Sequence, residues 1–426
     1  MILTQEQEDI LAGKSGETLA KVMKTLVMYG DAFGADKMVP VTSKYNHLVT
    51  SFGLKVMSPV YDLMQKLVDA GVSSGQKFTM DPRPLDDNVP ANFLQKFVFK
   101  KFMYTKQDTY EKQLEKLGLL NSDAFTCACY MDEVGNKPAF GDVLSWSESS
   151  AVVYANSVLG ARCNRNSGIM DIMGSIAGYV PHFGLLTDEG RLATWIIKVE
   201  TTKKPDAQLL GSAIGMKVME DVPYVYGLNQ YLGSELDDAA CTYLKDFGAA
   251  TASNGAVGLY HIHDLTPEAK TLGEALIAKD AKVYVIDDKE LERVKNNYPV
   301  IWKKPDAKPK LCFMGCPHMS LEQLKSWTDK VEAALKKEGN SKVTVPTVFT
   351  AAPAVLREFE STEYAARLKK CGVITSYICP LMYMNNPLCK KMPVITSSNK
   401  LRTYTSAKYM TDDEILVAIT TKGGKK

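Results

Sequence analysis

The sequence lacks the features that mark membrane, exported and nucleic-acid-binding proteins. No uncharged apolar run reaches the roughly 18 residues that a membrane-spanning helix needs. The N-terminus carries Gln5-Glu6-Gln7-Glu8-Asp9, where a signal peptide would have a basic start and an apolar core. The 51 basic and 49 acidic residues are mixed along the chain, so no region of one charge sign attracts nucleic acid. We therefore expect a cytoplasmic protein with no nucleic-acid partner and no membrane partner.

The motifs of several large enzyme classes are also absent. The chain has no G-x-G-x-x-G after a strand, no H-E-x-x-H and no G-x-S-x-G, and Gly13-Lys14-Ser15 lacks the upstream glycine of a P-loop. Nucleotide-binding and serine-hydrolase functions therefore lose their usual support. The nine cysteines are an odd number in a chain without export signals, so disulfides are not expected. Most of these cysteines are expected to be small buried hydrophobic residues.

The chain does contain enough hydrophobic sequence for several lobes. At 426 residues, 45% of them hydrophobic, it is too long for one uniform core, so two or three packed lobes are expected. The first quarter is mostly helical. Residues 17–29 carry an amphipathic stripe that ends at Gly30 as a C-cap, and residues 62–71 and 107–119 are also predicted helices.

Beyond the first quarter, short β-type runs alternate with helical stretches. This alternation predicts α/β lobes with mostly parallel sheets. A Lys- and Pro-rich stretch, Lys303–Lys310, is the predicted boundary, and it divides the chain into residues 1–305 and residues 306–426. The predicted strands are Trp195–Val199, Gly255–Tyr260, Val283–Ile286, Leu311–Met314, Val343–Thr350 and Val373–Ser376.

The clearest predicted unit surrounds a Gly-Cys-Pro-His sequence. A strand at 310–315 leads into Gly315-Cys316-Pro317-His318, and a helix follows in which Ser320 and Gln323 have capping-box spacing. The Cys-Pro-His turn is therefore expected at the carboxyl end of a strand, where open α/β sheets bind their ligands.

Three cysteines have polar, turn-like neighbours that differ from those of core cysteines. Cys127 lies in Thr-Cys-Ala-Cys-Tyr, Cys316 in Gly-Cys-Pro-His and Cys379 in Tyr-Ile-Cys-Pro. A metal or cluster role and a packing role both fit this spacing. Cys312 lies within an apolar run and is expected to be packed in the core.

A second concentration of polar residues runs from Ser145 to Ser150 and continues at Asn156 and in Gly160–Asn166, which contains Arg162 and Arg165. Arginine and asparagine beside small residues suit recognition of a carboxylate or a phosphate. A capped helix start with surface arginines fits the same pattern.

At these residues the chain resembles the aconitase X family over nearly its full length. The resemblance is carried by Trp146–Ala151, by Tyr154–Arg162 and by Gly315–His318 followed by Ser-Leu-Glu at 320–322. It implies an aconitase-like, multi-lobed, three-layer α/β fold that corresponds to the first three domains of aconitase. It also implies the large subunit of a hydro-lyase, with a separate small subunit that carries the swivelling fourth domain.

The resemblance further implies an iron–sulfur cluster held by three cysteines, [4Fe-4S] rather than [2Fe-2S]. The family's cysteine positions match Cys127, Cys316 and Cys379, although Cys129 replaces the usual proline of the first turn and Tyr377-Ile378 replaces Asp-Thr before the third cysteine. The family's T-N-S-A-K segment corresponds to residues 396–400 in altered form. From this match the expected catalytic residues are Ser149, Ser150 and His318, and the expected substrate-binding residues are Asn156, Arg162, Arg165 and Lys400.

Several alternatives stay open from the sequence. Family activities include dehydration of phosphomevalonate, which the extra Arg165 favours, and dehydration of cis-3-hydroxy-L-proline. A non-catalytic zinc protein using Cys312, Cys316 and His318, or a scaffold without a cluster, are the non-enzymatic alternatives. Ser43 and His47 lie near the family's Ser-x-His element at shifted spacing, so they carry little weight. His182, His261 and His263 are expected to be structural or solvent-facing.

Overall fold

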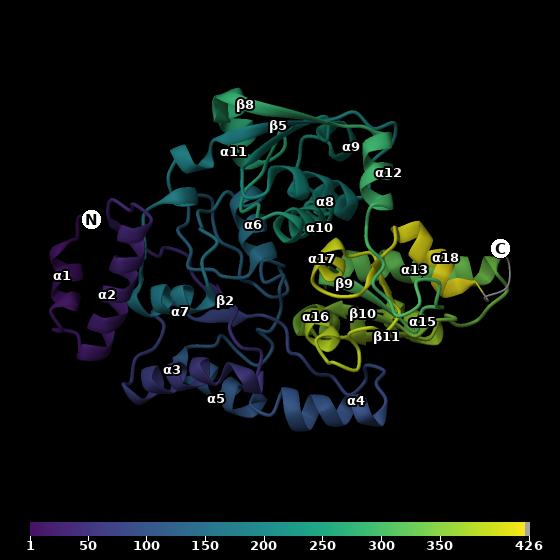
Figure 1. The fold of residues 1–426 in the computed structure, drawn as a ribbon, viewed down its shortest axis with the longest axis horizontal. Helices are drawn as coiled ribbons and strands as arrows, with labels where there is room; N and C mark the ends of the chain where they lie inside the picture. The colour runs from purple at the N-terminus through teal and green to yellow at the C-terminus, as the bar shows by residue number, and fades with distance from the viewer. Residues whose placement is uncertain (422–426) are drawn as a thin grey trace.

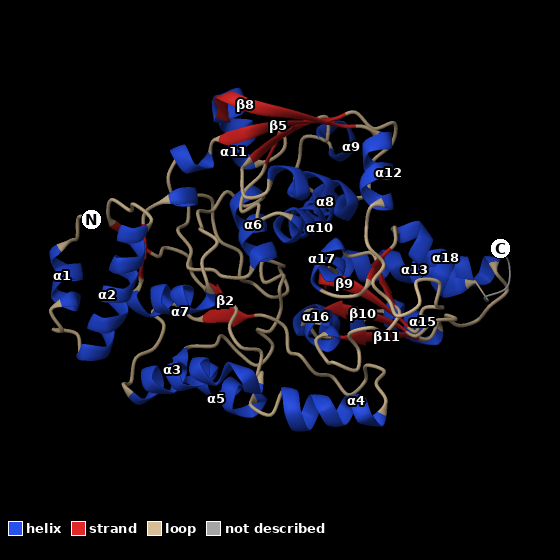
Figure 2. Ribbon diagram, viewed as in Figure 1, coloured by secondary structure: helices blue, strands red, loops and turns tan. Residues whose placement is uncertain are grey.

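The computed structural model describes residues 1–421, which form three lobes around a central region of loops (Figure 1). The N-terminal helices lie at one end of the molecule and the last helix at the other. Helices pack against the larger sheets, and β5 and β8 lie at an outer edge of the molecule (Figure 2). The predicted α/β fold, with mostly parallel sheets and a mostly helical N-terminal segment, is confirmed. Within the described residues, no helix is long and apolar enough to cross a membrane.

The first lobe is helical apart from two two-stranded sheets. Strand β2 pairs with β3 in parallel, and β1 pairs with β4 antiparallel. Short 3-10 turns occur at Lys55–Met57, Gly184–Leu186 and Glu189–Arg191, and Phe99–Met103 is π-helical. The main elements are α1 (Gln5–Leu11), α2 (Glu17–Ala32), β1 (Met38–Pro40), β2 (Asn46–Leu48), α3 (Ser58–Asp69), β3 (Phe78–Met80), α4 (Phe93–Val98), α5 (Gln107–Leu117), α6 (Ser149–Ser157), α7 (Gly168–Ala177) and β4 (Tyr179–Pro181).

One predicted helix end in this lobe is wrong. Gly30 does not cap the helix at 17–29 but lies inside α2, whose C-cap is Phe33. A Cβ atom at Gly30 would lie 2.6 Å from the Cβ of Pro181 on β4. Glycine at this position therefore lets α2 pack closely against β4, and tertiary packing explains the residue better than helix termination does.

The second lobe is a parallel sheet of order β7-β6-β5-β8 with helices packed on it. The predicted strand Gly255–Tyr260 is wrong, because the paired strand is β7 at His261–Ile262. The backbone N–H of Tyr260 donates instead to the Ser157 hydroxyl, so this apolar stretch is buried without joining the sheet. The elements are β5 (Ala193–Val199), α8 (Ala207–Val218), β6 (Pro223–Tyr226), α9 (Asn229–Leu232), α10 (Asp238–Asn254), β7, α11 (Pro267–Leu272), a 3-10 turn (Gly273–Leu276), β8 (Ile277–Ile286) and α12 (Asp288–Asn296).

The third lobe is an all-parallel sheet of order β11-β10-β9-β12-β13. The predicted capping box is confirmed, because the side chains of Ser320 and Gln323 bond each other's backbone N–H at the start of α13. The elements are β9 (Leu311–Met319), α13 (Leu321–Lys337), β10 (Thr347–Ala351), α14 (Pro353–Glu360), α15 (Glu363–Lys370), β11 (Val373–Ser376), α16 (Pro380–Met384), β12 (Val394–Thr396), α17 (Asn399–Tyr404), β13 (Lys408–Tyr409) and α18 (Asp412–Thr420).

The Gly-Cys-Pro-His sequence is a bulge within β9 rather than a turn after it. Met314 of β9 pairs with Phe349 of β10, but the next pair joins Met319 to Ala351, so the residues between leave the ladder. Gly315 has a positive φ of 96°, a conformation that glycine adopts at little cost. The bulge turns the backbone at Cys316 out of the regular sheet pattern. The predicted strand Val343–Thr350 is likewise shorter, because pairing begins at Thr347.

Candidate functional site

The candidate site lies where parallel segments of the first lobe end. His47 of β2 pairs with Thr79 of β3, Phe125 forms a bridge with Met80, and Trp146 forms a bridge with His47. These parallel segments therefore end at a common edge. His47 itself, and three residues just beyond these segments, supply the first lobe's site residues: His47, Asp81, Cys127 and Glu148.

The third lobe supplies residues from the carboxyl ends of its own parallel strands. Cys316 and His318 lie in the β9 bulge, Cys379 follows β11 as the N-cap of α16, and Lys400 follows β12 in the first turn of α17. Ligands of open α/β sheets bind at this end of the strands. The two lobes therefore meet at the edges where their parallel strands end. Residues far apart in the sequence come into contact there: Glu148 and Lys400 are separated by 252 positions.

The three predicted cluster cysteines, Cys127, Cys316 and Cys379, belong to this common region. Each is less than 10% exposed, and each is a free thiol. Burial raises the pKa of all three thiols, and negative charge on Cys316 raises the pKa of Cys127 and Cys379 further. The ammonium of Lys400 lowers the pKa of all three. Lys400 is therefore the cation that favours their thiolate forms.

Lys400 forms a buried ion pair with Glu148. The ammonium donates to one Glu148 carboxylate oxygen and to the Ser150 hydroxyl, which lies 3.1 Å away. The other oxygen accepts from the Ser150 hydroxyl at 2.7 Å and from the Ala151 N–H at 2.6 Å, so Glu148 also caps α6. Burial alone would raise the pKa of Glu148, but Lys400 lowers it, and the carboxyl group is ionised. Predicted residues Ser150 and Lys400 are thus brought together.

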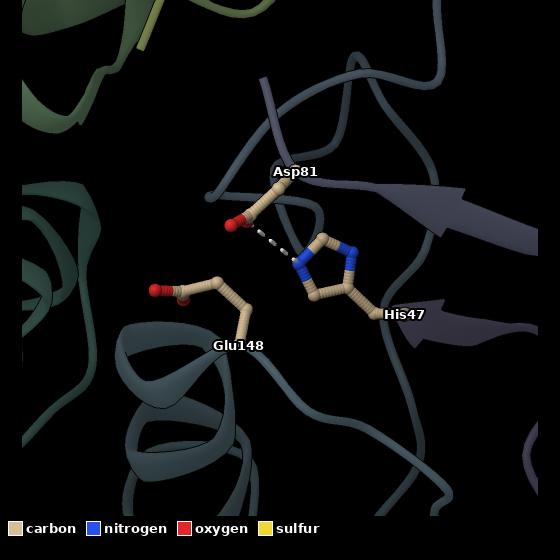
Figure 3. Close-up of side chains that lie close together, drawn as sticks. All are labelled: His47, Asp81 and Glu148. Carbon is tan, nitrogen blue, oxygen red and sulfur yellow. Dashed lines mark ion pairs between the residues drawn. The ribbon is translucent and has the colours of Figure 1, made fainter. Parts of the chain in front are cut away.

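His47 and Asp81 face Glu148 across the same space (Figure 3). The Nδ1 atom of His47 lies 2.8 Å from the Thr79 hydroxyl, which also accepts from Asn136 and donates to a backbone carbonyl. Nδ1 therefore carries the proton and Nε2 carries a lone pair. Nε2 lies 3.9 Å from Asp81 Oδ1, and both atoms are buried without a hydrogen-bond partner.

Burial perturbs both of these groups. It lowers the pKa of His47 to about 4, so the imidazole is neutral near pH 7. It raises the pKa of Asp81 well above its usual value, and the negative charge of Glu148 raises it further. Buried polar atoms without partners are rare in folded proteins and mark places where a ligand or water completes the bonding. Perturbed pKa values in such a place are typical of functional sites.

Sequence reasoning missed Asp81 and gave Glu148 no role, and it gave His47 little weight. The available signal was a carboxylate directly after the short β-type run Phe78-Thr79-Met80. That run is only three residues long, and its partner strand β2 is equally short. Pairing between segments this short depends on the surrounding tertiary structure, so periodicity does not detect it.

Arg165 has the geometry expected of an anion-binding residue. Its Nη1 atom is buried and has no hydrogen-bond partner. Burial lowers the pKa of Arg165, while the charges of Tyr404 and Glu148 raise it, which places the guanidinium within electrostatic range of the Glu148 carboxylate. Ser149 opens α6 beside Glu148 and is partly exposed. Both residues therefore remain candidates for substrate contact.

Two predicted substrate-binding residues are committed to internal bonds instead. Arg162 donates to the Leu186 carbonyl at 2.9 Å and pairs with exposed Asp188. Asn156 donates to the carbonyls of Cys163 and Gly258, both at 2.8 Å, and accepts from the Cys163 N–H. Both side chains therefore brace neighbouring loops, and their contact with substrate stays a prediction.

His318 is similarly engaged, since its Nδ1 lies 3.0 Å from the Thr126 hydroxyl and its Nε2 lies 3.1 Å from the Ile378 carbonyl. Burial lowers the pKa of His318 to about 4, so the ring is neutral. Both ring nitrogens are thus bonded to protein groups, and a catalytic role of His318 stays a prediction.

The remaining histidines match their expected structural or solvent-facing roles. His261 is buried and bonds the Arg191 carbonyl at 2.9 Å, His263 bonds Tyr224, and His182 pairs with exposed Asp36. Ser43 is buried, and its hydroxyl has no partner.

Comparisons with known proteins identify the fold. Models of the first, second and third aconitase X domains match residues 1–189, 193–296 and 309–415. The phosphomevalonate dehydratase large subunit of Thermococcus kodakarensis is 33% identical over 362 residues, which cover 83% of this chain and 82% of that protein. A cis-3-hydroxy-L-proline dehydratase of Hypocrea jecorina is 28% identical over 333 residues, 76% of this chain and 52% of that protein.

The crystal structure of Thermococcus kodakaraensis aconitase X in its holo-form superposes with a TM-score of 0.79 at 28% identity, over 98% of this chain and 99% of that one. The expected aconitase-like fold and the coverage of the first three domains are confirmed. A boundary near Lys303–Lys310 that divides the chain in two stays a prediction. Because the three domain models together match most of its length, the chain belongs to the aconitase X family.

Proposed function

We propose that this chain is the large subunit of an iron–sulfur hydro-lyase that removes water from phosphomevalonate. The observation that carries the proposal is the meeting of three buried thiols with Lys400, Glu148, Asp81 and His47 at the facing edges of two lobes. The curated relatives named above are dehydratases, which supports the reaction class.

The residues present fit a cluster better than a single zinc ion. Donor atoms bound to one zinc at about 2.3 Å lie within roughly 4 Å of one another. Within residues 1–421, three side chains have possible ligand atoms that all lie within 4.8 Å of one another. They are His47, Asp81 and Glu148, and none of them is a cysteine. The zinc alternative that uses Cys312 and His318 is disfavoured, because Cys312 is fully buried in the core and both nitrogens of His318 are engaged.

In the proposal, Cys127, Cys316 and Cys379 hold the cluster, [4Fe-4S] rather than [2Fe-2S]. Three protein ligands leave one position open, and the bound group would supply Lewis-acid activation of a hydroxyl. Lys400 favours the thiolates that such a group requires. Glu148 in turn holds Lys400 in place through the buried ion pair.

The first-lobe residues would manage the proton that leaves with the hydroxyl. Burial and the charge of Glu148 raise the pKa of Asp81, which favours the protonated acid that would donate a proton to the departing hydroxide to give water. Neutral His47 offers its Nε2 lone pair 3.9 Å from Asp81, where it would help to orient the carboxyl group. Glu148 stays ionised beside Lys400. Its negative charge favours the protonated form of Asp81, so the two carboxyl groups can take different roles.

The choice of phosphomevalonate rests on Arg165. The Nη1 atom of Arg165 is buried without a hydrogen-bond partner, so it can donate to an anion in addition to Lys400. The planar guanidinium group matches the geometry of a phosphate. cis-3-Hydroxy-L-proline is the alternative substrate, and it carries no phosphate that would use this donor.

A partner must complete the reaction in this proposal. Asp81 is the proton donor for the leaving group, so a separate base must remove the proton from the neighbouring carbon. The relative from Thermococcus kodakarensis is named a large subunit. We therefore assign the base to a small subunit homologous to the fourth domain of aconitase. The two subunits would act together in the cytoplasm.

The proposal is tested by anaerobic purification of the chain, alone and with its small subunit, followed by iron and sulfide analysis and turnover assays. We expect iron with acid-labile sulfide, and phosphomevalonate dehydration only when both subunits are present. The Arg165→Lys variant should lose more activity toward phosphomevalonate than toward hydroxyproline. Stoichiometric zinc, or robust turnover by the chain alone, would contradict the proposal.

A further inference from the structure

His318 makes hydrogen bonds beside two of the three cysteines and lies close to the third in sequence. It lies two residues after Cys316 in the β9 bulge. Its Nδ1 lies 3.0 Å from the hydroxyl of Thr126, the residue before Cys127. Its Nε2 lies 3.1 Å from the carbonyl of Ile378, the residue before Cys379. Segments 126–127, 316–318 and 378–379 are far apart in the chain and meet at this ring.

The direction of each hydrogen bond follows from the atoms involved. A carbonyl oxygen only accepts, so Nε2 carries the ring proton and donates to Ile378. Nδ1 of the neutral ring is then an acceptor, and the Thr126 hydroxyl donates to it. The Thr126 oxygen in turn accepts from the Ala128 N–H at 3.0 Å, which fixes the turn that contains Cys127.

The backbone of His318 adds a direct contact to a thiol. Its N–H donates to the Cys127 sulfur, with a nitrogen-to-sulfur distance of 3.3 Å. His318 is 0% exposed, so water does not compete for these bonds. Three hydrogen bonds thus join one buried residue to the cysteine-bearing segments on both sides of the lobe interface.

We propose that His318 is a positioning residue that sets the separation of Cys127, Cys316 and Cys379 and thereby fixes how firmly the chain holds its cluster. This inference rests on the proposed function. In this role His318 does not contact the substrate. Residues that orient metal ligands through hydrogen bonds change metal affinity by about 10- to 100-fold when they are replaced.

Four variants of the full-length chain test the inference. His318→Leu removes both ring contacts at similar volume, and His318→Gln restores one N–H donor for the Ile378 carbonyl. Thr126→Val removes the hydroxyl at the other end. His261→Leu is the matched control, because His261 is 1% exposed and also bonds a backbone carbonyl, but it lies on β7 in the second lobe.

Each variant is reconstituted anaerobically with iron and sulfide, and the rate of iron loss to a chelator is followed by absorbance. Electron paramagnetic resonance of the reduced cluster and thermal melting of the cluster-free chain are recorded as well. We expect iron loss to be about tenfold faster or more in His318→Leu, with an altered resonance spectrum. His318→Gln should lie between this variant and the wild type. His261→Leu should melt earlier but keep the wild-type rate and spectrum.

Wild-type iron retention and spectrum in folded His318→Leu would overturn the inference. If His318→Leu does not fold, Thr126→Val decides the matter: faster iron loss supports the inference, and wild-type retention overturns it. Two failures can be told apart. If the wild-type chain takes up no iron, the proposed function fails together with the inference. If wild type and variants take up iron and retain it equally, only the inference fails.

Discussion

Glu148 performs several tasks with one carboxylate. It caps α6 through the Ala151 N–H, accepts from Ser150, pairs with Lys400 and faces His47 and Asp81. The bonds to Lys400 and to the start of α6 keep the carboxylate ionised although it is buried. A negative charge in this position raises the pKa of Asp81 next to it. The local structure of α6 and the proton chemistry of the site therefore depend on the same side chain.

Replacing Lys400 by Met should destabilise the chain strongly. The Glu148 carboxylate would remain buried without its cation, and breaking a buried ion pair in this way costs about 3–5 kcal/mol. Urea unfolding at pH 7 measures the effect. Lys325→Met is the matched control, because Lys325 pairs with Glu322 on the surface, where such pairs contribute about 1 kcal/mol or less. Equal losses in the two variants would contradict the importance assigned to the buried pair.

His47 should make stability depend on acid pH. Burial lowers its pKa from 6.5 to about 4, so between these values the unfolded chain binds a proton that the folded chain does not. Stability should therefore fall as pH is lowered from 6.5 toward 4. The contribution amounts to about 2 kcal/mol between pH 7 and pH 5. Urea unfolding of the wild type and of His47→Gln at both pH values gives this difference directly. An identical pH dependence would show that His47 titrates normally.

At the scale of single elements, the bulge in β9 decides where Cys316 lies. Gly315 enables the bulge through its positive φ, and an added Cβ would lie 2.2 Å from the backbone carbonyl oxygen of Thr350 on β10. The Ser398 hydroxyl donates to the Cys316 carbonyl and links the bulge to the loop after β12.

Gly315→Ala should therefore destabilise the third lobe. The variant combines the cost of a positive φ with a collision against backbone that cannot move aside, and we expect a loss of more than about 2 kcal/mol. Gly339→Ala separates the two terms, because Gly339 also has a positive φ, of 65°, but nothing lies within 4 Å of its added Cβ. Thermal melting of both variants measures the difference. Equal shifts would show that packing against β10 is unimportant.

At the scale of the whole molecule, the site exists only because two lobes meet with the carboxyl edges of parallel segments facing each other. The first lobe brings His47, Asp81, Cys127 and Glu148, and the third brings Cys316, Cys379 and Lys400. The connection between the second and third lobes, residues 297–310, holds no helix or strand. Trp302 anchors this connection, since it is buried and donates to the Ser406 carbonyl.

Limited digestion with trypsin should cut this connection without separating the lobes. Lys303 and Lys304 are exposed, and Lys304 precedes a proline, so cleavage after Lys303 is expected first. The fragments should stay associated, because the buried Glu148–Lys400 pair and the core join them. Native mass spectrometry measures both outcomes. A first cut elsewhere, or dissociation of the fragments, would contradict the predicted boundary at Lys303–Lys310.

The sequence predicted the longer elements well and the short ones poorly. The amphipathic helix of α2, the strand of β5 and the capping box of α13 were readable, because periodicity and cap chemistry are local. β7 was misplaced, because an apolar run shows that a segment is buried but not which segment it pairs with. β2 and β3 were not found, since three residues carry no measurable period.

The sequence by itself determined the family, the fold class and the residues that carry its motifs, among them the three cysteines, Ser150, Arg165 and Lys400. Only the tertiary structure decided which polar residues remain free to act. Arg162 and Asn156 donate hydrogen bonds to neighbouring loops. His318 bonds the cysteine-bearing segments. Asp81 and His47 each keep a buried atom without a hydrogen-bond partner. The physical reason is that hydrogen-bond satisfaction is a property of spatial neighbours, and the neighbours at this site are far apart in the chain.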